Sequence, residues 1–459
     1  MGSTEPDQKP INLQLGWPTP SLFPTNALAE ATQAVLLDSE SAAESLVYGP
    51  DPGHVSLRSR IASWLSDFYQ PRAGQINPAR LFVTNGASAA LGMLLSRFTS
   101  PTYTRTIWMV EPTYFLACAS FNDAGFEGRL RGVPEDNEGI DIDFLRRSIQ
   151  GVEAQAQATG AQKPPSSKAK VFRHIIYVVP TFSNPSGKIM SLRRREQLVR
   201  LAREFDACII SDDVYDWLRW PASEAKGNGS VDDKQLPPPP PRLVDIDRAL
   251  PGGSPWGNAV SNGSFSKIVA PGVRVGWVEG SPLLSADLCK FGAVVSGGSQ
   301  GHLSSMFVGH LLQSGALEQH IYQALIPVYQ QRYYAMMESI KTHLYPLGIT
   351  VAPLGTCEED RGDGHLPVVG GFFLFLRFPK DSPPVSKVAE YALSHLGLRI
   401  AHGDLMTVRG DADGLIRAKQ TFGQGARLCW AWHGEDEIDE GIQRLAIAFQ
   451  SVVQGPTIS

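Results

Sequence analysis

Lys267 is the side chain in this sequence best placed to act as a nucleophile, in the segment NGSFSKIVAPGVRVGW. A lysine amine attacks a carbonyl group when it is held close to it and partly desolvated, so that the neutral form is accessible. Gly263, Ser264 and Ser266 leave room for a bulky planar group, and the serine hydroxyls can donate to phosphate oxygens. Arg274 can clamp a phosphate with its guanidinium fork. Taken alone, such a segment more often holds a surface lysine.

A second group follows a continuous apolar run in the segment IISDDVYDWL. Such a run is typical of a buried parallel strand, and α/β sheets bind ligands at the carboxyl ends of their strands. A carboxylate at Asp212 can hold a ring nitrogen protonated, which lets the ring accept electrons. Tyr215, three residues later, can meet the same ring. The competing interpretation is that Asp212 or Asp213 caps a helix.

Asn184 and Tyr114 also follow predicted strands. Asn184 precedes a proline in YVVPTFSNPSGKIMS and can donate its amide to a phenolate oxygen, although an ordinary turn also favours asparagine there. Tyr114 lies in the segment EPTYFLACASF and can stack on a cofactor face. A tyrosine buried in the core is the alternative for this position.

The segment TNGASAAL predicts a strand followed directly by the first turn of a helix. The backbone N–H groups of Ala87 and Ser88, just after Gly86, would point toward a bound anion, and the helix dipole would favour negative charge there. A plain turn between a strand and a helix is equally compatible with this pattern.

The elements that must position these groups alternate between strand and helix. Apolar runs bounded by turns predict strands at 79–85, 106–110, 174–180 and 207–211, and RREQLVRLAREF predicts an amphipathic crossover helix. This alternation favours an α/β doubly wound core over two unrelated α/β domains. Long helical segments after about residue 303, with strands near GGFFLFLRFP and ARLCWAW, predict a second, α+β domain.

The predicted organisation has three parts. Residues 1–47 form an N-terminal arm that belongs to the small domain, 48–302 form a large domain, and 303–459 form the small C-terminal domain. Residues 152–170 and 222–242 are poor in apolar side chains and rich in small, polar and proline residues. We expect both to be mobile insertions in the large domain.

Composition excludes several classes of function. The chain has 459 residues, of which 42% are hydrophobic and 19% charged, and a formal net charge of -5, with no long basic block. We therefore expect no nucleic-acid partner. No long apolar run is present, so we expect no membrane partner. The cysteines stand apart, without metal-ligand spacing, which predicts no metal site and a cytoplasmic location; they are Cys118, Cys208, Cys289, Cys357 and Cys429.

Together these motifs resemble one family, the class I/II aminotransferases of the pyridoxal phosphate (PLP) fold type I. The resemblance runs from about residue 11 to 450 and includes YGPDPGHVSLR near the start and ARLCWAWHGEDEIDEGIQRLA near the end. It implies a large domain with a mostly parallel seven-stranded sheet and a smaller α+β domain. The segments LGWPTPSLFP and SDDVYDWL resemble the subgroup of aminoadipate, kynurenine and aromatic-amino-acid aminotransferases. The matching residues occur in family order: Tyr48, Gly86, Ala87, Ser88, Tyr114, Asn184, Asp212, Tyr215, Lys267, Arg274 and Arg427.

The resemblance implies a cofactor role for most of these residues. Lys267 would form a Schiff base with PLP and then move the Cα proton, and Asp212 would pair with the ring nitrogen. Tyr215 and Asn184 would bond the phenolate oxygen, and Tyr114 would stack on the ring. The phosphate would be bound by Ala87, Ser88, Ser264, Ser266 and Arg274.

The resemblance also implies how substrates and a second subunit take part. Arg427 would clamp the substrate α-carboxylate, and Asn184 would lie beside it. Tyr48 would reach the phosphate of the neighbouring subunit, which implies a homodimer with shared active sites. Gly16 and Trp17 would close over the side-chain pocket. The expected partners are an amino acid and a 2-oxo acid.

Two other functions remain open from the sequence. The same fold hosts PLP-dependent elimination, cyclisation and C–C bond formation, and Lys267 and Asp212 would serve each of them. Some bacterial regulators join a DNA-binding winged helix to this fold, but the 47 residues before Tyr48 lack that pattern. No second arginine stands out as a partner for an acidic substrate side chain, which argues against strict aspartate or glutamate specificity.

Overall fold

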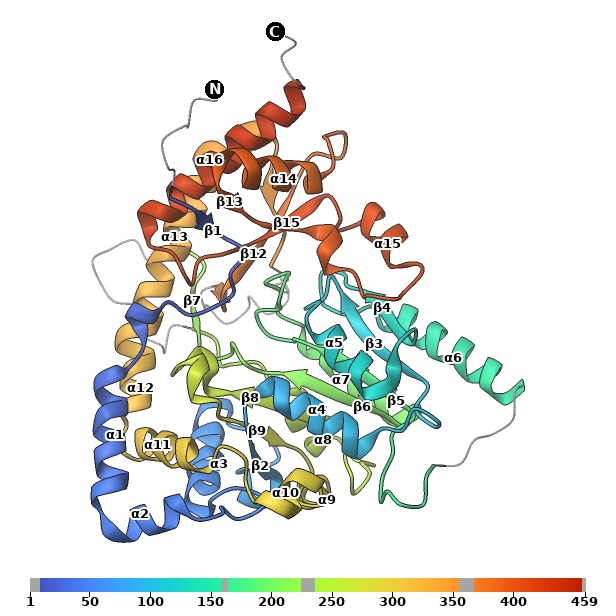
Figure 1. The fold of residues 1–459 in the computed structure, drawn as a ribbon. Helices are drawn as coiled ribbons and strands as arrows, with labels where there is room; N and C mark the ends of the chain where they lie inside the picture. The colour runs from blue at the N-terminus through green and yellow to red at the C-terminus, as the bar shows by residue number, and fades with distance from the viewer. Residues whose placement is uncertain (1–8, 159–163, 224–235, 355–366, 456–459) are drawn as a thin grey trace, which may run out of the picture.

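The computed structural model describes residues 9–158, 164–223, 236–354 and 367–455. A seven-stranded sheet with the order β2-β9-β8-β6-β5-β3-β4 lies at the centre of the large domain (Figure 1). Its strands are β2 Leu81–Thr84, β3 Thr106–Glu111, β4 Leu130–Pro134, β5 His174–Val178, β6 Ala207–Asp212, β8 Ala259–Ser264 and β9 Gly276–Glu279.

Strand β9 runs antiparallel to both of its neighbours, β2 and β8, whereas β8, β6, β5, β3 and β4 pair in parallel. The predicted mostly parallel, seven-stranded sheet is thus confirmed. The carboxyl ends of β2, β3, β5, β6 and β8 meet at one edge of the sheet. The loops that follow these strands therefore lie close together.

Helices cover both faces of this sheet, which explains the continuous apolar runs of the central strands. Every residue of β5 is buried, and so is all of β6 except its last residue. Helix α4 (Ala87–Phe98) contacts β2, β8 and β9 on one face. On the other face, α7 (Leu192–Glu204) contacts β6 and packs between α6 (Ile142–Ala158) and α8 (Leu243–Ala249).

The small domain is built on an antiparallel sheet with the order β10-β12-β15-β14. Helix α16 packs against both α13 and α14, and at its start the Gly434 N–H donates to the Glu437 side chain at 3.4 Å. The elements are β10 Thr350–Val351, β12 Phe373–Arg377, β14 Ala401–His402, β15 Gly425–Cys429, α13 Ile326–His343, α14 Val385–Leu396 and α16 Glu435–Gln454.

The N-terminal segment joins the two domains. Strand β1 (Ile11–Asn12) pairs in parallel with β13 (Leu398–Arg399) of the small domain. Further along, α1 (Thr25–Leu37) packs against α11 (His302–Gln313), which in turn packs against α3 (Val55–Tyr69) of the large domain. In Figure 1 the blue arm runs from the small domain at the top down the side of the molecule. The segment between β1 and α1 therefore passes the edge where the two domains meet.

Parts of both stretches predicted to be mobile insertions are ordered in the structure. Helix α6 continues to Ala158, and Glu153 on it accepts hydrogen bonds from Arg173, so residues 152–158 are not a loop. Lys170, beyond the gap at 159–163, pairs with Asp206. Arg242, at the end of the second stretch, is fully buried and ion-paired. The prediction missed these contacts because an apolar count ignores buried charges. Residues 159–163 and 224–235 lie outside the described residues.

Across the described residues, no helix is long and apolar enough to cross a membrane, and no group of His, Cys, Asp or Glu side chains could hold a metal ion.

Candidate active site

A cavity of about 500 Å³ opens at the carboxyl edge of the large sheet and is also lined by β12, β13 and β15 of the small domain. It brings together nearly all of the side chains singled out from the sequence. Those that line it are Gly16, Trp17, Ala87, Ser88, Tyr114, Asn184, Asp212, Tyr215, Ser264, Ser266, Lys267, Arg274 and Arg427. Tyr48 does not line this cavity; it is 83% exposed elsewhere on the subunit.

Lys267 ends a short 3-10 turn that directly follows β8. The turn begins at Ser264, whose side chain accepts a hydrogen bond from the Ser266 N–H at 3.1 Å. The Lys267 Nζ donates to the Gly16 carbonyl oxygen at 2.9 Å and lies above the Tyr215 ring. Burial lowers the pKa of Lys267 to about 8, although the charge of Asp212 opposes this shift. The amine is therefore partly neutral near physiological pH.

Asp212 ends β6, and the segment after it contains no helix, so the helix-capping alternative is wrong. The Tyr177 hydroxyl donates to Asp212 Oδ2 at 2.6 Å. Oδ1 of the same carboxylate is buried without a hydrogen-bond partner among the described residues. Burial raises the pKa of Asp212 to about 6, against the hydrogen bond from Tyr177 and the charge of Lys267. A cationic group that enters the cavity would satisfy this oxygen.

Arg427 comes from the small domain, on β15, and is buried. Its guanidinium donates to Asn184 Oδ1 at 2.7 Å and to the Gln14 carbonyl oxygen at 2.5 Å, and it lies 4.2 Å from the centre of the Phe373 ring. Tyr215 is buried beside Phe373, and burial raises its pKa well above the ordinary value. Its hydroxyl therefore stays protonated and can donate a hydrogen bond.

An anion cradle lies at the start of α4. Gly86 caps this helix with φ 87°, a conformation that L side chains rarely adopt. A Cβ at Gly86 would lie 2.4 Å from Nη2 of Arg274, so glycine also allows the guanidinium to approach. Arg274 donates to the Asn85 carbonyl oxygen at 2.9 Å and reaches Ser266 Oγ at 3.4 Å. Backbone N–H groups, hydroxyls and a guanidinium thus meet at one point.

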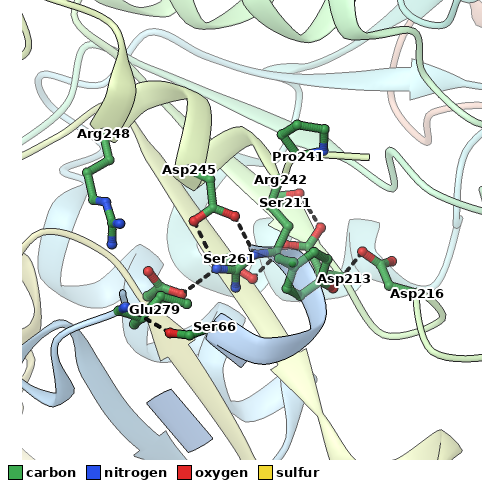
Figure 2. Close-up of polar contacts among 12 residues, drawn as sticks. Ser66, Ser211, Asp213, Asp216, Pro241, Arg242, Asp245, Arg248, Ser261 and Glu279 are labelled. Atoms are coloured by element: carbon green, nitrogen blue, oxygen red, sulfur yellow. Dashed lines mark hydrogen bonds and ion pairs between the residues drawn. The ribbon is translucent and has the colours of Figure 1, made fainter. Parts of the chain in front are cut away.

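A buried polar network fixes the strands behind Asp212 (Figure 2). Asp213 accepts hydrogen bonds from Ser211 on β6 and Ser261 on β8, which are directly paired in the sheet. Burial, and then the neighbouring charge of Asp216, raise the pKa of Asp213. Farther along, Arg242 pairs with Asp245 at 2.9 Å and with Glu279 at 2.8 Å. The contacts of Asp213 link β6 with β8, and those of Arg242 link β9 with the start of α8.

The N-terminal arm closes one side of the cavity. A Cβ at Gly16 would lie 2.6 Å from the Phe373 ring, which shows how closely the arm packs there. Trp17 is 58% exposed and makes an edge contact with Trp432. The arm thus places a backbone carbonyl against Lys267 and an aromatic side chain at the mouth of the cavity.

The sequence analysis missed several residues at the site. Tyr177 lies inside the strand that was read only as an apolar run, and its partner Asp212 is reached through the pairing of β5 with β6. Arg399 and Phe373 line the cavity from the small domain. For Tyr177 the signal was a polar hydroxyl within a fully buried strand. For Arg399 no local motif exists, because only strand pairing brings it to the cavity.

These residues fit a planar anionic cofactor with a ring nitrogen. The orphaned Asp212 oxygen suits a ring cation, the Gly86–Arg274 cradle suits a phosphate, and Lys267 lies between them as a nucleophile. The fold and the site together define a PLP-dependent transferase of fold type I.

Comparison with known proteins gives the family. The aminotransferase class I and II family matches residues 10–445, so the chain belongs to this family and is a PLP-dependent aminotransferase. The uncharacterized protein YER152C of Saccharomyces cerevisiae is 33% identical, over 95% of this chain and 96% of its own. Aromatic-amino-acid aminotransferase 1 of Thermococcus litoralis is 27% identical, over 95% and 87%. The structure of Pyrococcus horikoshii kynurenine aminotransferase superposes with a TM-score of 0.72 and 25% identity, covering 97% and 91% of the two chains.

Proposed function

We propose that this aminotransferase moves the amino group of an apolar, aromatic or aminoadipate-like amino acid to 2-oxoglutarate or another 2-oxo acid. The observation that carries the proposal is the convergence of Lys267, Asp212 and Arg427 on one cavity. The names of the relatives, an aromatic-amino-acid and a kynurenine aminotransferase, support the same class of donor.

The cofactor would be held at both of its ends. Ala87, Ser88, Ser264, Ser266 and Arg274 would bind the phosphate of PLP, because they line the cradle at the start of α4. Asp212 would hold the ring nitrogen through the oxygen that has no partner among the described residues. Bound there, PLP supplies a ring that accepts the electron pair released when a bond to the substrate Cα breaks.

The protein's own groups orient the substrate and move its proton. Arg427 binds the α-carboxylate with its guanidinium fork, which is already held in place by Asn184 and Gln14. The pKa of Lys267 is about 8, and above it Nζ is neutral. In this form Nζ would accept the proton from Cα and donate it again later in the reaction. The protonated hydroxyl of Tyr215 and the amide of Asn184 stabilise negative charge on the ring oxygen.

The mouth of the cavity favours a large uncharged side chain. Trp17, Phe115 and Leu116 line it, and Trp17 and Leu116 are exposed. Their burial against an apolar substrate would contribute roughly 25 cal/mol for each Å² removed from water. Tyr114 lines the same cavity and would cover the face of the ring.

The active unit would be a homodimer with shared sites. Tyr48 is exposed, and so are the preceding Leu46 and Val47, and these apolar side chains would suit contact with a second copy. Tyr48 would reach the phosphate in the partner subunit. Mixing a Lys267→Ala variant with a Tyr48→Ala variant tests this arrangement. Hybrid dimers should regain one intact site, and activity that stays at the level of the two parents would contradict sharing.

One experiment identifies the donor. The holoenzyme is incubated with single amino acids, and the loss of its visible cofactor absorbance is followed while the 2-oxo acid product is measured. We expect aromatic and long apolar amino acids to react fastest. A deuterated Cα substrate separates this reaction from elimination or C–C bond formation. A product that keeps its amino group, or no 2-oxo acid from any amino acid, would refute the proposal.

A further inference from the structure

Arg399 is an arginine of the active-site cavity for which the reaction described above has no use. It lies at the end of β13, where the parallel pairing with β1 places it beside Asn12. Both residues line the same cavity as Arg427 and Lys267. Arg399 makes no hydrogen bond or ion pair with any other described residue, and its side chain is exposed.

The charges that line the cavity leave Arg399 without a counterpart. Asp212 is the carboxylate among the lining residues, and it faces Lys267 and the ring-nitrogen position. Arg274 belongs to the phosphate cradle, and Arg427 would bind the α-carboxylate. An arginine fork without a partner in a cavity is suited to bind a carboxylate in two hydrogen bonds. The guanidinium of Arg399 is therefore suited to bind a second anionic group on the substrate.

Arg399 and Arg427 both reach the cavity from strands of the small domain. Ala401 on β14 is the direct partner of Arg427 on β15, so their side chains leave the same face of the sheet. Arg399 ends β13, which pairs with β1 in a separate two-stranded sheet and is followed by β14 after one residue. Both arginines line the cavity, Arg427 in contact with Asn184 and Arg399 beside the arm.

The arm adds further polar groups to this corner. Asn12 Oδ1 accepts a hydrogen bond from the Gln14 N–H at 3.1 Å, which leaves the amide nitrogen of Asn12 as a donor. The backbone N–H of Asn12 donates a hydrogen bond to Nε2 of His433 at 2.9 Å, which fixes the position of Asn12. An arginine and a neighbouring amide donor are suited to a carboxylate and add nothing for a neutral side chain.

We propose that Arg399, with Asn12, forms a subsite for the distal carboxylate of dicarboxylic substrates, an inference that rests on the proposed aminotransferase function. Arg427 holds the α-carboxylate while Arg399 holds the second one. In the overall reaction the donor's amino group and the acceptor's carbonyl oxygen are exchanged, so that no external oxidant is needed. A neutral donor uses the apolar mouth near Trp17, and a dicarboxylic acceptor uses Arg399.

Acceptor kinetics test the subsite. With one donor fixed, kcat/KM of the holoenzyme is compared for 2-oxoglutarate and for 4-methyl-2-oxopentanoate, which has no second carboxylate. Arg399→Leu should lower the value for 2-oxoglutarate roughly 10- to 100-fold and the value for the neutral-chain acid far less. Arg399→Lys should recover part of the loss, because it keeps the charge without the fork.

The matched control is Arg377→Leu. Arg377 lies on the neighbouring strand β12 and lines a different cavity, so its loss should leave the ratio of the two acceptors unchanged. An equal loss for both acceptors in Arg399→Leu, or an unchanged ratio, would overturn the subsite.

A binding measurement separates the subsite from the proposed reaction. Glutarate and pentanoate, which differ by one carboxylate, are titrated into the holoenzyme and their Kd values compared by the change in cofactor absorbance. Wild type should prefer glutarate, and Arg399→Leu should lose this preference. Equal affinity in wild type would overturn the subsite. An enzyme that converts no amino acid but still prefers glutarate through Arg399 would refute only the proposed reaction.

Discussion

The Tyr177 hydroxyl binds one oxygen of the Asp212 carboxylate and leaves the other buried without a partner among the described residues. A half-satisfied buried carboxylate is costly on its own, because desolvation disfavours its charged form. The cost is useful at a site that must recruit a cation, since the incoming group supplies the missing hydrogen bond.

Asp212→Asn should change how the stability of the cofactor-free protein depends on pH. Folding raises the pKa of this carboxyl from 3.8 to about 6, so the folded state holds the proton more tightly. In wild type this group's contribution is fully present below pH 3.8 and is lost as pH rises to about 6, by at most about 3 kcal/mol. Urea unfolding across this range should show a smaller fall in Asp212→Asn. The exposed-site control Asp67→Asn should keep the wild-type slope, and identical slopes in all three proteins would contradict the assignment.

The Lys267 amine should titrate near pH 8 in the cofactor-free protein. Its pKa is lowered by burial to about 8, so the neutral, reactive fraction rises as pH passes through that value. Labelling by an amine-specific reagent, followed by mass spectrometry of the peptide, gives this pKa directly. Asp212→Asn should shift the curve to lower pH, because it removes a charge that favours the ammonium form.

The Lys267→Ala variant tests whether this lysine forms the covalent bond to the cofactor. It should retain PLP noncovalently, lose the borohydride-trapped adduct and lower the turnover about 10³-fold. Lys387→Ala, at an exposed position on α14, is the control. A trapped adduct that persists in Lys267→Ala would place the Schiff base on another lysine.

Gly86→Ala should weaken PLP binding and destabilise the protein by about 1 to 2 kcal/mol. The residue has φ 87°, and the new Cβ would collide with Arg274, which must then move away from the cradle. Cofactor Kd and thermal unfolding measure the two effects. Gly92→Ala is a matched control in the same helix, where a Cβ meets nothing within 4 Å. This control should be neutral or stabilising. Equal behaviour of the two variants would refute a role for the cap.

Arg427→Leu should raise KM for the amino donor more than it lowers kcat, with kcat/KM falling about 100-fold. The guanidinium is buried, and its loss also leaves Asn184 Oδ1 and the Gln14 carbonyl without their donor. Arg427→Lys should recover part of the loss. The readout is the preference of each variant for an amino acid over the corresponding amine. A preference that survives in Arg427→Leu would show that another group binds the α-carboxylate.

The residues that could be predicted from the sequence are those whose neighbours in the chain belong to the same site. Lys267 is preceded by Ser264 and followed by Arg274, and all three line the cavity. The central sheet was also predictable, because buried parallel strands are continuous apolar runs between turns.

What the sequence could not show depends on pairing between distant segments. Arg399 reaches the cavity only through the pairing of β13 with β1, about 390 positions away in the chain. Arg242 reads as part of a polar insertion, yet it is buried because Asp245 and Glu279 neutralise it. Local composition carries no information on such partners.

The hydrogen bond from Lys267 to the Gly16 carbonyl has a consequence for the timing of the reaction. A free ammonium group donates three hydrogens, whereas a lysine nitrogen bonded to carbon on a ligand has fewer to offer. The Gly16 carbonyl would therefore stabilise the free amine of Lys267 more than an amine bonded to a cofactor carbon. Ile11 and Asn12 of the same segment pair with the small domain, so this hydrogen bond connects Lys267 of the large domain with the small domain. The arm would thus serve as a resting position for the free amine of Lys267.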